Sequence, residues 1–244
     1  MKGIYIITGT SRGIGAAVAA RLLETGNRVV GISRSPSPLD GEPGYRSVRA
    51  SVTDTDWIDP LFEAVRKELA DSDVDMLCLL NNAAVVEPVH AIETCAADAI
   101  GQHVDVNLTA PIQLTARFMA CFGDLDLRKK VVFMTSGAAH AAMPDMALYC
   151  TSKAGLAMFA QCVAREQAGR AKGYEIAQVS PGMVETHMQE LARSQSPGTF
   201  RPSGMFRSAK ASGAVQDPGS VAKKICEILA ARTGMGESVS VTSW

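Results

Sequence analysis

Short runs of apolar and β-branched residues alternate along the chain with longer stretches that have helical spacing. Residues 3–8 and 28–33 are two such runs, and residues 16–25 between them form a helical pattern. Further strands are predicted at residues 45–51, 76–81, 130–135, 174–179 and 238–241. The runs are apolar almost throughout, which indicates strands covered on both faces. The pattern predicts an α/β protein with a doubly wound parallel sheet of about seven strands and helices on both faces.

Two segments interrupt this alternation, and both are rich in glycine, proline and serine. They are residues 33–44 and residues 195–218. A loop as long as the second is usually functional or disordered when it lies inside a compact domain. Only one helix and one short strand are predicted after it, so it does not read as an interdomain linker. We therefore expect residues 1–244 to form a single domain.

Composition narrows the class of partner. The 244 residues are 47% hydrophobic and 20% charged, with a formal net charge of −1 and no dense run of lysine and arginine. The sequence therefore has no basic segment of the kind that binds nucleic acid or an anionic membrane surface, and this favours a small-molecule substrate. The opening MKGIYIITGT does not resemble a secretory signal, and no apolar stretch approaches membrane-spanning length. We expect a soluble, cytoplasmic protein.

Cysteine and histidine spacing does not predict a metal site. The six cysteines contain no C-x-x-C pair and lie mostly in apolar runs, which favours free buried thiols over disulfides or metal ligands. The four histidines show neither H-x-x-x-H spacing nor partnering cysteines. We assign no metal.

The stretch TGTSRGIG, residues 8–15, places three glycines after the first predicted strand and at the start of a helix. A dinucleotide pyrophosphate binds at such a turn, where small residues let it approach backbone N–H groups and the positive end of the helix. The spacing is G-x-x-x-G-x-G rather than G-x-G-x-x-G. A tight strand-to-helix turn without a ligand is therefore the alternative interpretation.

Three residues far from this turn suggest acid–base chemistry. Tyr149 and Lys153 are four apart in a helical stretch and share one helix face, while Ser136 follows the apolar run VVFMT. A tyrosine has an ordinary pKa near 10, and a neighbouring ammonium favours its anion. The alternative is a core tyrosine beside a solvated lysine.

The order of these motifs resembles the short-chain dehydrogenase/reductase family over nearly the whole chain. TGTSRGIG resembles its cofactor turn and NNAA (81–84) its N-N-A-G, while PGMVET (181–186) is similar to a segment that contacts the nicotinamide end. The resemblance implies a Rossmann-type fold, and it implies that the catalytic residues are Asn107, Ser136, Tyr149 and Lys153.

The resemblance also implies a role for each residue. Tyr149 would donate a proton to a carbonyl oxygen that Ser136 also contacts, and Lys153 would lower the pKa of the tyrosine and hold the nicotinamide ribose. Asn107 would support a water chain. Cofactor contacts are implied at Gly9, Ser11, Arg12, Gly13, Ile14, Gly15, Arg34, Val52, Asn82, Ala83, Asn107, Tyr149, Lys153, Pro181, Gly182, Val184 and Thr186. Substrate contacts are expected at Ser136, Tyr149, Met143, Met183 and Met188.

Two positions depart from the family pattern. Ala84 stands where glycine is usual, so the backbone there must avoid a positive φ or accept strain. Ser51 stands where an aspartate commonly meets the adenine, which removes one cofactor contact.

The residues at the end of the second predicted strand indicate which of the two dinucleotides, NAD(H) or NADP(H), the protein binds. An acidic side chain there usually accepts from the ribose 2′-hydroxyl, but this chain has Ser33 and Arg34, and the next acid is Asp40. Arg12 and Arg34 could both bind a 2′-phosphate through charge-assisted hydrogen bonds. We expect NADP(H) as the cofactor. The alternative is that both arginines are solvated surface charges.

The substrate is less closely defined. Residues 186–218 combine apolar and small residues and are interpreted as a lid over an apolar site, or alternatively as a subunit contact. Within the family the chain most resembles the branch of sepiapterin and benzil reductases. The tail SVSVTSW lacks the acid that would hold a pterin, which favours reduction of a small aromatic ketone or diketone.

Two other functions remain open at this level. One is oxidation of a hydroxyacyl or sugar-alcohol substrate, and the other is a dinucleotide-binding regulator without catalysis. The complete set of asparagine, serine, tyrosine and lysine argues against the regulator. The family resemblance also suggests a homodimer or homotetramer.

Overall fold

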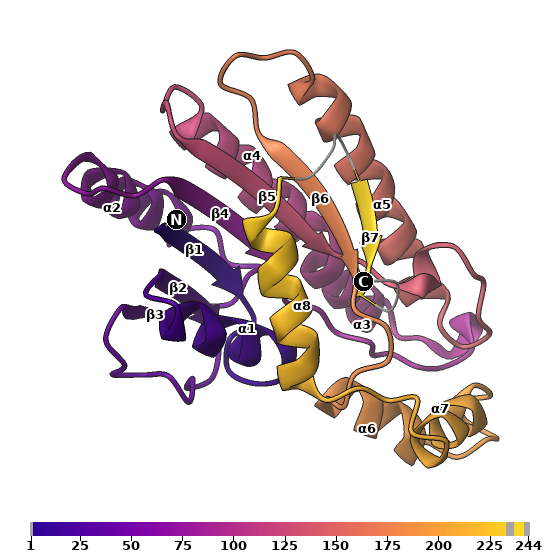
Figure 1. The fold of residues 1–244 in the computed structure, drawn as a ribbon. Helices are drawn as coiled ribbons and strands as arrows, with labels where there is room; N and C mark the ends of the chain where they lie inside the picture. Colours follow the sequence, from indigo (N-terminus) through magenta and orange to yellow (C-terminus); the bar gives the residue numbers. More distant parts are fainter. Residues whose placement is uncertain (1, 233–236, 242–244) are drawn as a thin grey trace.

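The computed structural model describes residues 2–232 and 237–241 (Figure 1). Residues 242–244, the end of the tail that argued against a pterin, lie outside the described residues. The strands are β1 Gly3–Thr8, β2 Arg28–Ser33, β3 Tyr45–Arg49, β4 Met76–Asn81, β5 Arg128–Met134, β6 Glu175–Ser180 and β7 Glu237–Ser240. The α-helices are α1 Gly13–Glu24, α2 Ile58–Ala70, α3 Ala97–Val104, α4 Ala110–Phe122, α5 Ala147–Gln167, α6 His187–Ser194, α7 Ser203–Ala211 and α8 Pro218–Ala230. Short helical turns are η1 Ile92–Thr94, η2 Asp105–Thr109 and η3 Gly137–Ala139.

The strands form one seven-stranded sheet in the order β3-β2-β1-β4-β5-β6-β7, and every neighbouring pair is parallel. This confirms the predicted α/β class and strand number. The strand order reverses between β1 and β4. In open α/β sheets, ligands bind beyond the carboxyl ends of the strands at such a reversal.

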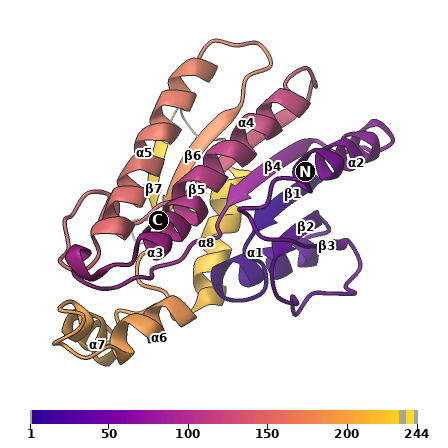
Figure 2. The same cartoon turned by 180° about the vertical axis from the view of Figure 1, so that it is seen from behind.

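Helices cover both faces of the sheet, because successive strand residues point to opposite sides. Ile4 and Ile6 of β1 pack into a core with α2, α4 and α5, whereas Tyr5 and Ile7 pack into a second core with α1 and α8. Figure 1 shows α1 and α8 on one face, and Figure 2 shows α2, α4 and α5 on the other. Burial on both faces explains why the inner strands are nearly continuous apolar runs, whereas the edge strand β3, with the sequence YRSVR, is exposed at several positions.

The segment from 195 to 218 is more ordered than its composition predicts. The sequence indicated an irregular loop, but residues Ser203–Ala211 form α7, which packs against α6. The reason is that Phe206 is buried on one side of α7, so tertiary packing overrides the glycine and serine content. Both views place α6 and α7 beyond the carboxyl ends of the strands (Figures 1 and 2).

The cysteines are all free, but only Cys78 is fully buried and Cys162 is exposed. The expectation of buried thiols therefore holds for β4 and fails on the outer face of α5, where apolar neighbours do not imply burial. Within the described part of the chain, no cluster of His, Cys, Asp or Glu could hold a metal ion. Across the same residues, no helix combines the length and apolar character that crossing a bilayer requires.

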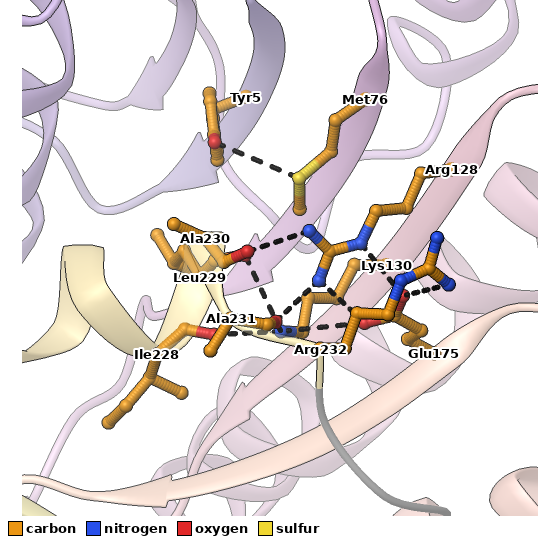
Figure 3. A network of polar contacts seen from close by, with 10 residues as sticks. All are labelled: Tyr5, Met76, Arg128, Lys130, Glu175, Ile228, Leu229, Ala230, Ala231 and Arg232. Carbon is orange, nitrogen blue, oxygen red and sulfur yellow. Dashed lines mark hydrogen bonds and ion pairs between the residues drawn. The ribbon is translucent and has the colours of Figure 1, made fainter. Parts of the chain in front are cut away.

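A buried lysine joins the sheet to the end of α8 (Figure 3). Lys130, on β5, is fully buried, and its Nζ donates to the carbonyl oxygens of Ile228 at 2.8 Å and Ala231 at 2.8 Å. The Glu175 carboxylate lies 3.7 Å away. The last carbonyls of a helix have no partner within it, so this ammonium caps α8 and is favoured by the helix dipole.

We expect Lys130→Met to destabilise the protein by about 1 to 2 kcal/mol, because it leaves the buried carbonyl oxygen of Ile228 without its donor, whereas Glu175 and the Ala231 carbonyl keep Arg128. Chemical denaturation would measure the loss. Lys223→Met, at an exposed position on α8, is the matched control and should change stability little. A loss no larger than that of the control would contradict the capping role.

Candidate active site

The glycine turn between β1 and α1 is held in a shape that side chains cannot adopt. Gly9 has a φ of 79° and Gly13 a φ of 61°, both in the left-handed region. A Cβ at Gly15 would lie 2.2 Å from the carbonyl oxygen of Gly9. The turn therefore presents backbone at the start of α1, as a pyrophosphate site requires.

Hydrogen bonds join this turn to the loop after β4, across the point where the strand order reverses. The Oγ1 of Thr8 accepts from the backbone N–H of Asn82 at 3.0 Å and of Ala83 at 2.9 Å. The Nδ2 of Asn82 donates to the carbonyl oxygen of Thr8 at 2.8 Å. Two motifs that are 74 residues apart in sequence thus form one continuous surface, on which we expect the cofactor to bind.

The loop after β2 is tied to the same turn through Thr10. Ser37 Oγ donates to the carbonyl oxygen of Thr10 at 3.0 Å, and Tyr45 donates its phenolic hydrogen to the hydroxyl of Thr10 at 2.8 Å. These contacts hold the segment that carries Arg34 beside the segment that carries Arg12. Both arginines are exposed, and neither guanidinium group has a hydrogen bond or ion pair with any other residue that the structure describes.

Asp40, the first acid after β2, is already engaged elsewhere. Its carboxylate lies 3.0 Å from Arg49 and accepts from the backbone N–H of Ser37 at 3.2 Å. Hydrogen bonding, with Ser47 the largest contributor, holds the pKa of Asp40 below its usual value. This carboxylate is therefore not available to a ribose hydroxyl beside Arg34.

Tyr149, Lys153 and Ser136 lie together at the carboxyl end of β5. Lys153 is buried on α5, donates to the carbonyl oxygen of Met134 at 2.8 Å and lies 5.6 Å from the centroid of the Tyr149 ring. Burial lowers the pKa of Lys153 to about 8. Burial raises the pKa of Tyr149, and a hydrogen bond with the Ser136 hydroxyl opposes that rise. In this arrangement burial dominates, so the tyrosine holds its proton.

Lys153→Met should stabilise the protein without cofactor, in contrast to Lys130→Met. The folded state disfavours the charged lysine, whose pKa falls from 10.5 to about 8. That cost is full below pH 8 and disappears as the pH rises through 10.5, and it amounts to about 3 kcal/mol at pH 7 and about 2 at pH 9. The unpaired Met134 carbonyl offsets about 1 kcal/mol.

We therefore expect a gain of about 2 kcal/mol at pH 7 that shrinks by about 1 kcal/mol at pH 9. Denaturant titrations at both pH values, with Lys223→Met as the control, measure it. A loss of stability at pH 7, or a gain that grows with pH, would contradict the burial argument.

Asn107 is fixed by hydrogen bonds from its own side chain, within the π-helical turn η2. Its Nδ2 donates to the carbonyl oxygen of Val85 at 2.7 Å and its Oδ1 accepts from the Val85 N–H at 2.8 Å. The Nε2 of His103 lies 2.9 Å from the Asn107 Nδ2, and its Nδ1 lies 2.7 Å from the carbonyl oxygen of Glu87. These partners require a neutral imidazole with its proton on Nδ1. Burial lowers the pKa of His103 in agreement with that state.

The segment PGMVET returns to the glycine turn. The Cγ2 of Thr186 would lie 3.4 Å from a Cβ at Gly13, so the start of α6 meets the start of α1. Val184 is buried and bridges to Gln216, and Gly182 has a φ of 75°. The remaining predicted cofactor positions Ser11, Ile14, Val52 and Pro181 are partly buried.

The two departures from the family pattern have simple local structures. Among the described residues other than glycine, only Asp145 has a positive φ, so Ala84 brings no backbone strain. Ser51 forms a turn instead of offering a carboxylate, since its Oγ lies 2.8 Å from the Oγ1 of Thr53 and its carbonyl oxygen accepts from the Trp57 indole at 2.9 Å.

An apolar cluster covers Tyr149 from the side of the predicted lid. This lid cluster consists of Val86, Val89, Ala138, Met146, Tyr149, Ala192, Phe200 and Phe206. Met143 and Met188, two of the predicted substrate residues, pack against it. Met183 does not belong to it, and its carbonyl oxygen instead accepts from the N–H of Gln216 at 2.8 Å.

The sequence analysis missed several residues that shape this site. His103 precedes Asn107 by one helical turn, and that spacing is the signal that could have identified it. Thr8 stands at the end of a predicted strand, where ligand-site residues gather. Asp145 offered no signal, because nothing in the sequence pairs it with Arg201.

Comparison with known proteins agrees with this geometry. A family model described as short chain dehydrogenase matches residues 3–197. The chain is 30% identical over 233 residues to the benzil reductase ((S)-benzoin forming) of Bacillus subtilis (strain 168), covering 96% of each chain. It is 30% identical over 243 residues to the sepiapterin reductase of Meriones unguiculatus, covering 93% of this chain and 90% of that protein. A solved short chain dehydrogenase/reductase from Saccharomyces cerevisiae shares the fold, with a TM-score of 0.81, 24% identity and coverage of 98% and 96%.

Proposed function

Because the chain belongs to the short-chain dehydrogenase family, we propose that it is an NADPH-dependent carbonyl reductase acting on small aromatic ketones or diketones. The observation that carries the proposal is the group of Ser136, Tyr149 and Lys153 at the carboxyl end of the sheet, beyond the glycine turn, in which Tyr149 and Lys153 are buried and Ser136 is partly buried. A protein that only sensed a dinucleotide would have no use for a buried proton donor.

The described residues fit a dinucleotide that carries a 2′-phosphate. The glycine turn offers bare backbone N–H groups at the start of α1. Arg12 and Arg34 would hold the 2′-phosphate, and Lys153 would hold the nicotinamide ribose. The cofactor, when bound, supplies the hydride for the carbonyl carbon.

The protein's own residues would position and polarise the carbonyl. Ser136 would donate a hydrogen bond to its oxygen, and Tyr149 would give that oxygen a proton from its phenol. Asn107, held by Val85 and His103, would keep the π-helical turn in place beside them. A water chain from this turn would then return a proton to the tyrosine.

The protonation state of Tyr149 is the one that carbonyl reduction requires. Burial raises its pKa, so the phenol keeps its proton at neutral pH and can serve as an acid. Oxidation of an alcohol would need the phenolate as the base. The missing acid beside Arg34 supports the same direction, because cells generally keep the phosphorylated cofactor reduced.

The lid cluster supports the substrate class. The residues of the lid cluster that pack with Tyr149 are apolar and include two aromatic rings, Phe200 and Phe206, which suits an aromatic group on the substrate. A benzil reductase is among the relatives, and benzil is an aromatic diketone.

A panel of carbonyl compounds would test the proposal. The purified protein would be assayed with NADPH and with NADH against benzil, smaller aromatic ketones and a pterin, with loss of the reduced cofactor as the readout. We expect the highest kcat/KM for a diketone with NADPH. Turnover of none of these compounds, or activity confined to the oxidation of alcohols, would overturn the proposal.

A further inference from the structure

Asp145 is held in an unusual conformation one turn before Tyr149. It is the only described residue other than glycine with a positive φ, at 60°, and it directly precedes Met146, the N-cap of α5. A non-glycine residue in this region costs free energy and persists only where its surroundings require it. Its side chain is nevertheless only 4% exposed.

The carboxylate of Asp145 is taken up by a single residue of the predicted lid. Oδ2 accepts from the backbone N–H of Arg201 at 2.8 Å and from its Nε at 3.0 Å, while Oδ1 accepts from its terminal Nη2 at 2.7 Å. Both the main chain and the side chain of Arg201 are therefore fixed. Hydrogen bonds from Arg201 lower the pKa of Asp145 to about 2, so the pair stays ionised at neutral pH.

This contact fixes the residue next to Arg201. Phe200 is fully buried, and its ring stacks on Phe206 with centroids 5.8 Å apart and an interplanar angle of 28°. Both rings belong to the lid cluster with Tyr149. Because Arg201 is 64% exposed at its side chain, the lid is held at its outer rim by charge and at its inner side by aromatic packing.

We propose that Asp145 is a positioning residue of the substrate site, which holds the lid cluster closed over Tyr149 by binding the main chain and side chain of Arg201. The proposal rests on the proposed function for the identity of that substrate. The strained turn that places Tyr149 at the start of α5 and the contact that closes the lid are then one structural unit. Asp145 therefore contributes both to the position of Tyr149, through its backbone, and to closure of the lid, through its carboxylate.

Kinetics of Asp145→Asn, Arg201→Met and the double variant would test this role. Asparagine tolerates the left-handed conformation, so Asp145→Asn removes the charge without changing the turn. We expect KM for the carbonyl substrate to rise about tenfold or more in each single variant, with no further loss in the double variant. Arg201→Lys should fall between, because an ammonium cannot fork across both oxygens.

The cofactor provides an internal reference for these kinetics. The dissociation constant of NADPH should stay unchanged, since the contact lies beyond the cofactor turn. Arg117→Met, which breaks an exposed ion pair with Asp59 on the α2–α4 side, is the matched control. Losses that add in the double variant, or a KM equal to that of the control, would overturn the proposal.

A second measurement does not depend on turnover. Chymotrypsin cuts after phenylalanine, and Phe200 and Phe206 are shielded while the lid is closed. Cleavage at these two sites should be several-fold faster in Asp145→Asn and Arg201→Met than in Arg117→Met. Equal cleavage would overturn the inference even if the enzyme reduces diketones, whereas faster cleavage in an enzyme that reduces none would leave the contact standing and remove only the proposed function.

Discussion

Tyr149→Phe is expected to lower kcat for carbonyl reduction by about 10²- to 10⁴-fold, the range that general acid catalysis contributes. The substitution removes one hydroxyl and leaves the ring in the lid cluster, so packing and folding change little. Affinity for NADPH should be nearly unchanged, because only one of the expected cofactor contacts is lost, while the glycine turn and Lys153 remain. Steady-state kinetics and a fluorescence titration with the cofactor measure the two quantities separately.

Tyr174→Phe is the control for this variant. Its hydroxyl is also buried, and it donates to the carbonyl oxygen of Met119 at 3.1 Å beneath α4, away from the carboxyl ends of the strands. We expect a loss of about 1 kcal/mol in stability and an unchanged kcat. If Tyr149→Phe kept most of its kcat, the proton would have to come from another group.

Arg12→Ala and Arg34→Ala are each expected to lower kcat/KM with NADPH by about ten- to a hundredfold. A hydrogen bond to a charged group contributes about 1.5 to 3 kcal/mol, and each arginine would supply such bonds to the 2′-phosphate. Activity with NADH should fall much less, because that cofactor has only a hydroxyl at this position. The comparison requires both cofactors with wild type and both variants.

Arg46→Ala gives the reference for removing a nearby exposed cation. Arg46 lies on β3 and pairs with Glu68 at 2.6 Å, so it should not contact the cofactor. Equal use of NADPH and NADH by wild type, or equal losses with both cofactors in Arg12→Ala and Arg34→Ala, would show that the two arginines are solvated surface charges.

Much of the fold is predictable from the sequence, because strands that are buried on both faces of the sheet appear as short runs of apolar residues. Every strand from β1 to β6 lies within two residues of its predicted bounds. In the inner strands the reason is that runs such as MLCLL, residues 76–80, have no polar position that could face solvent. Parallel pairing then places the ends of these strands on one edge. For this reason Gly9 and Ser136, which are distant in sequence, could be assigned to one edge of the sheet, and the family resemblance added Asn82.

The parts that could not be predicted depend on contacts between distant side chains. In the sequence, Lys130 is a charged residue at the start of a predicted strand. Only the position of α8 in the structure shows that its ammonium caps a helix. The sequence suggested that Lys153 lowers the pKa of Tyr149, whereas burial raises that pKa, because desolvation depends on everything packed around the ring. Residues 203–211 read as a loop for the same reason, since their helix needs the rest of the lid cluster.

The hydrogen bonds that join Thr8 to Asn82 have an entropic consequence. Ordering the backbone of one residue costs about 1 to 2 kcal/mol, and a loop that orders only on binding subtracts that cost from affinity. The surface on which the proposed cofactor would bind is already ordered in the free protein by the hydrogen bonds of Thr8 and Thr10. The entropy of ordering it is therefore lost during folding and not during cofactor binding. The lid is held mainly by the contact of Arg201 with Asp145 at the start of α5 and by the packing of its own aromatic rings. The loss of conformational entropy on binding should therefore reduce the affinity for the dinucleotide only slightly. It should reduce the affinity for the carbonyl substrate more, because the lid must open and close around that ligand.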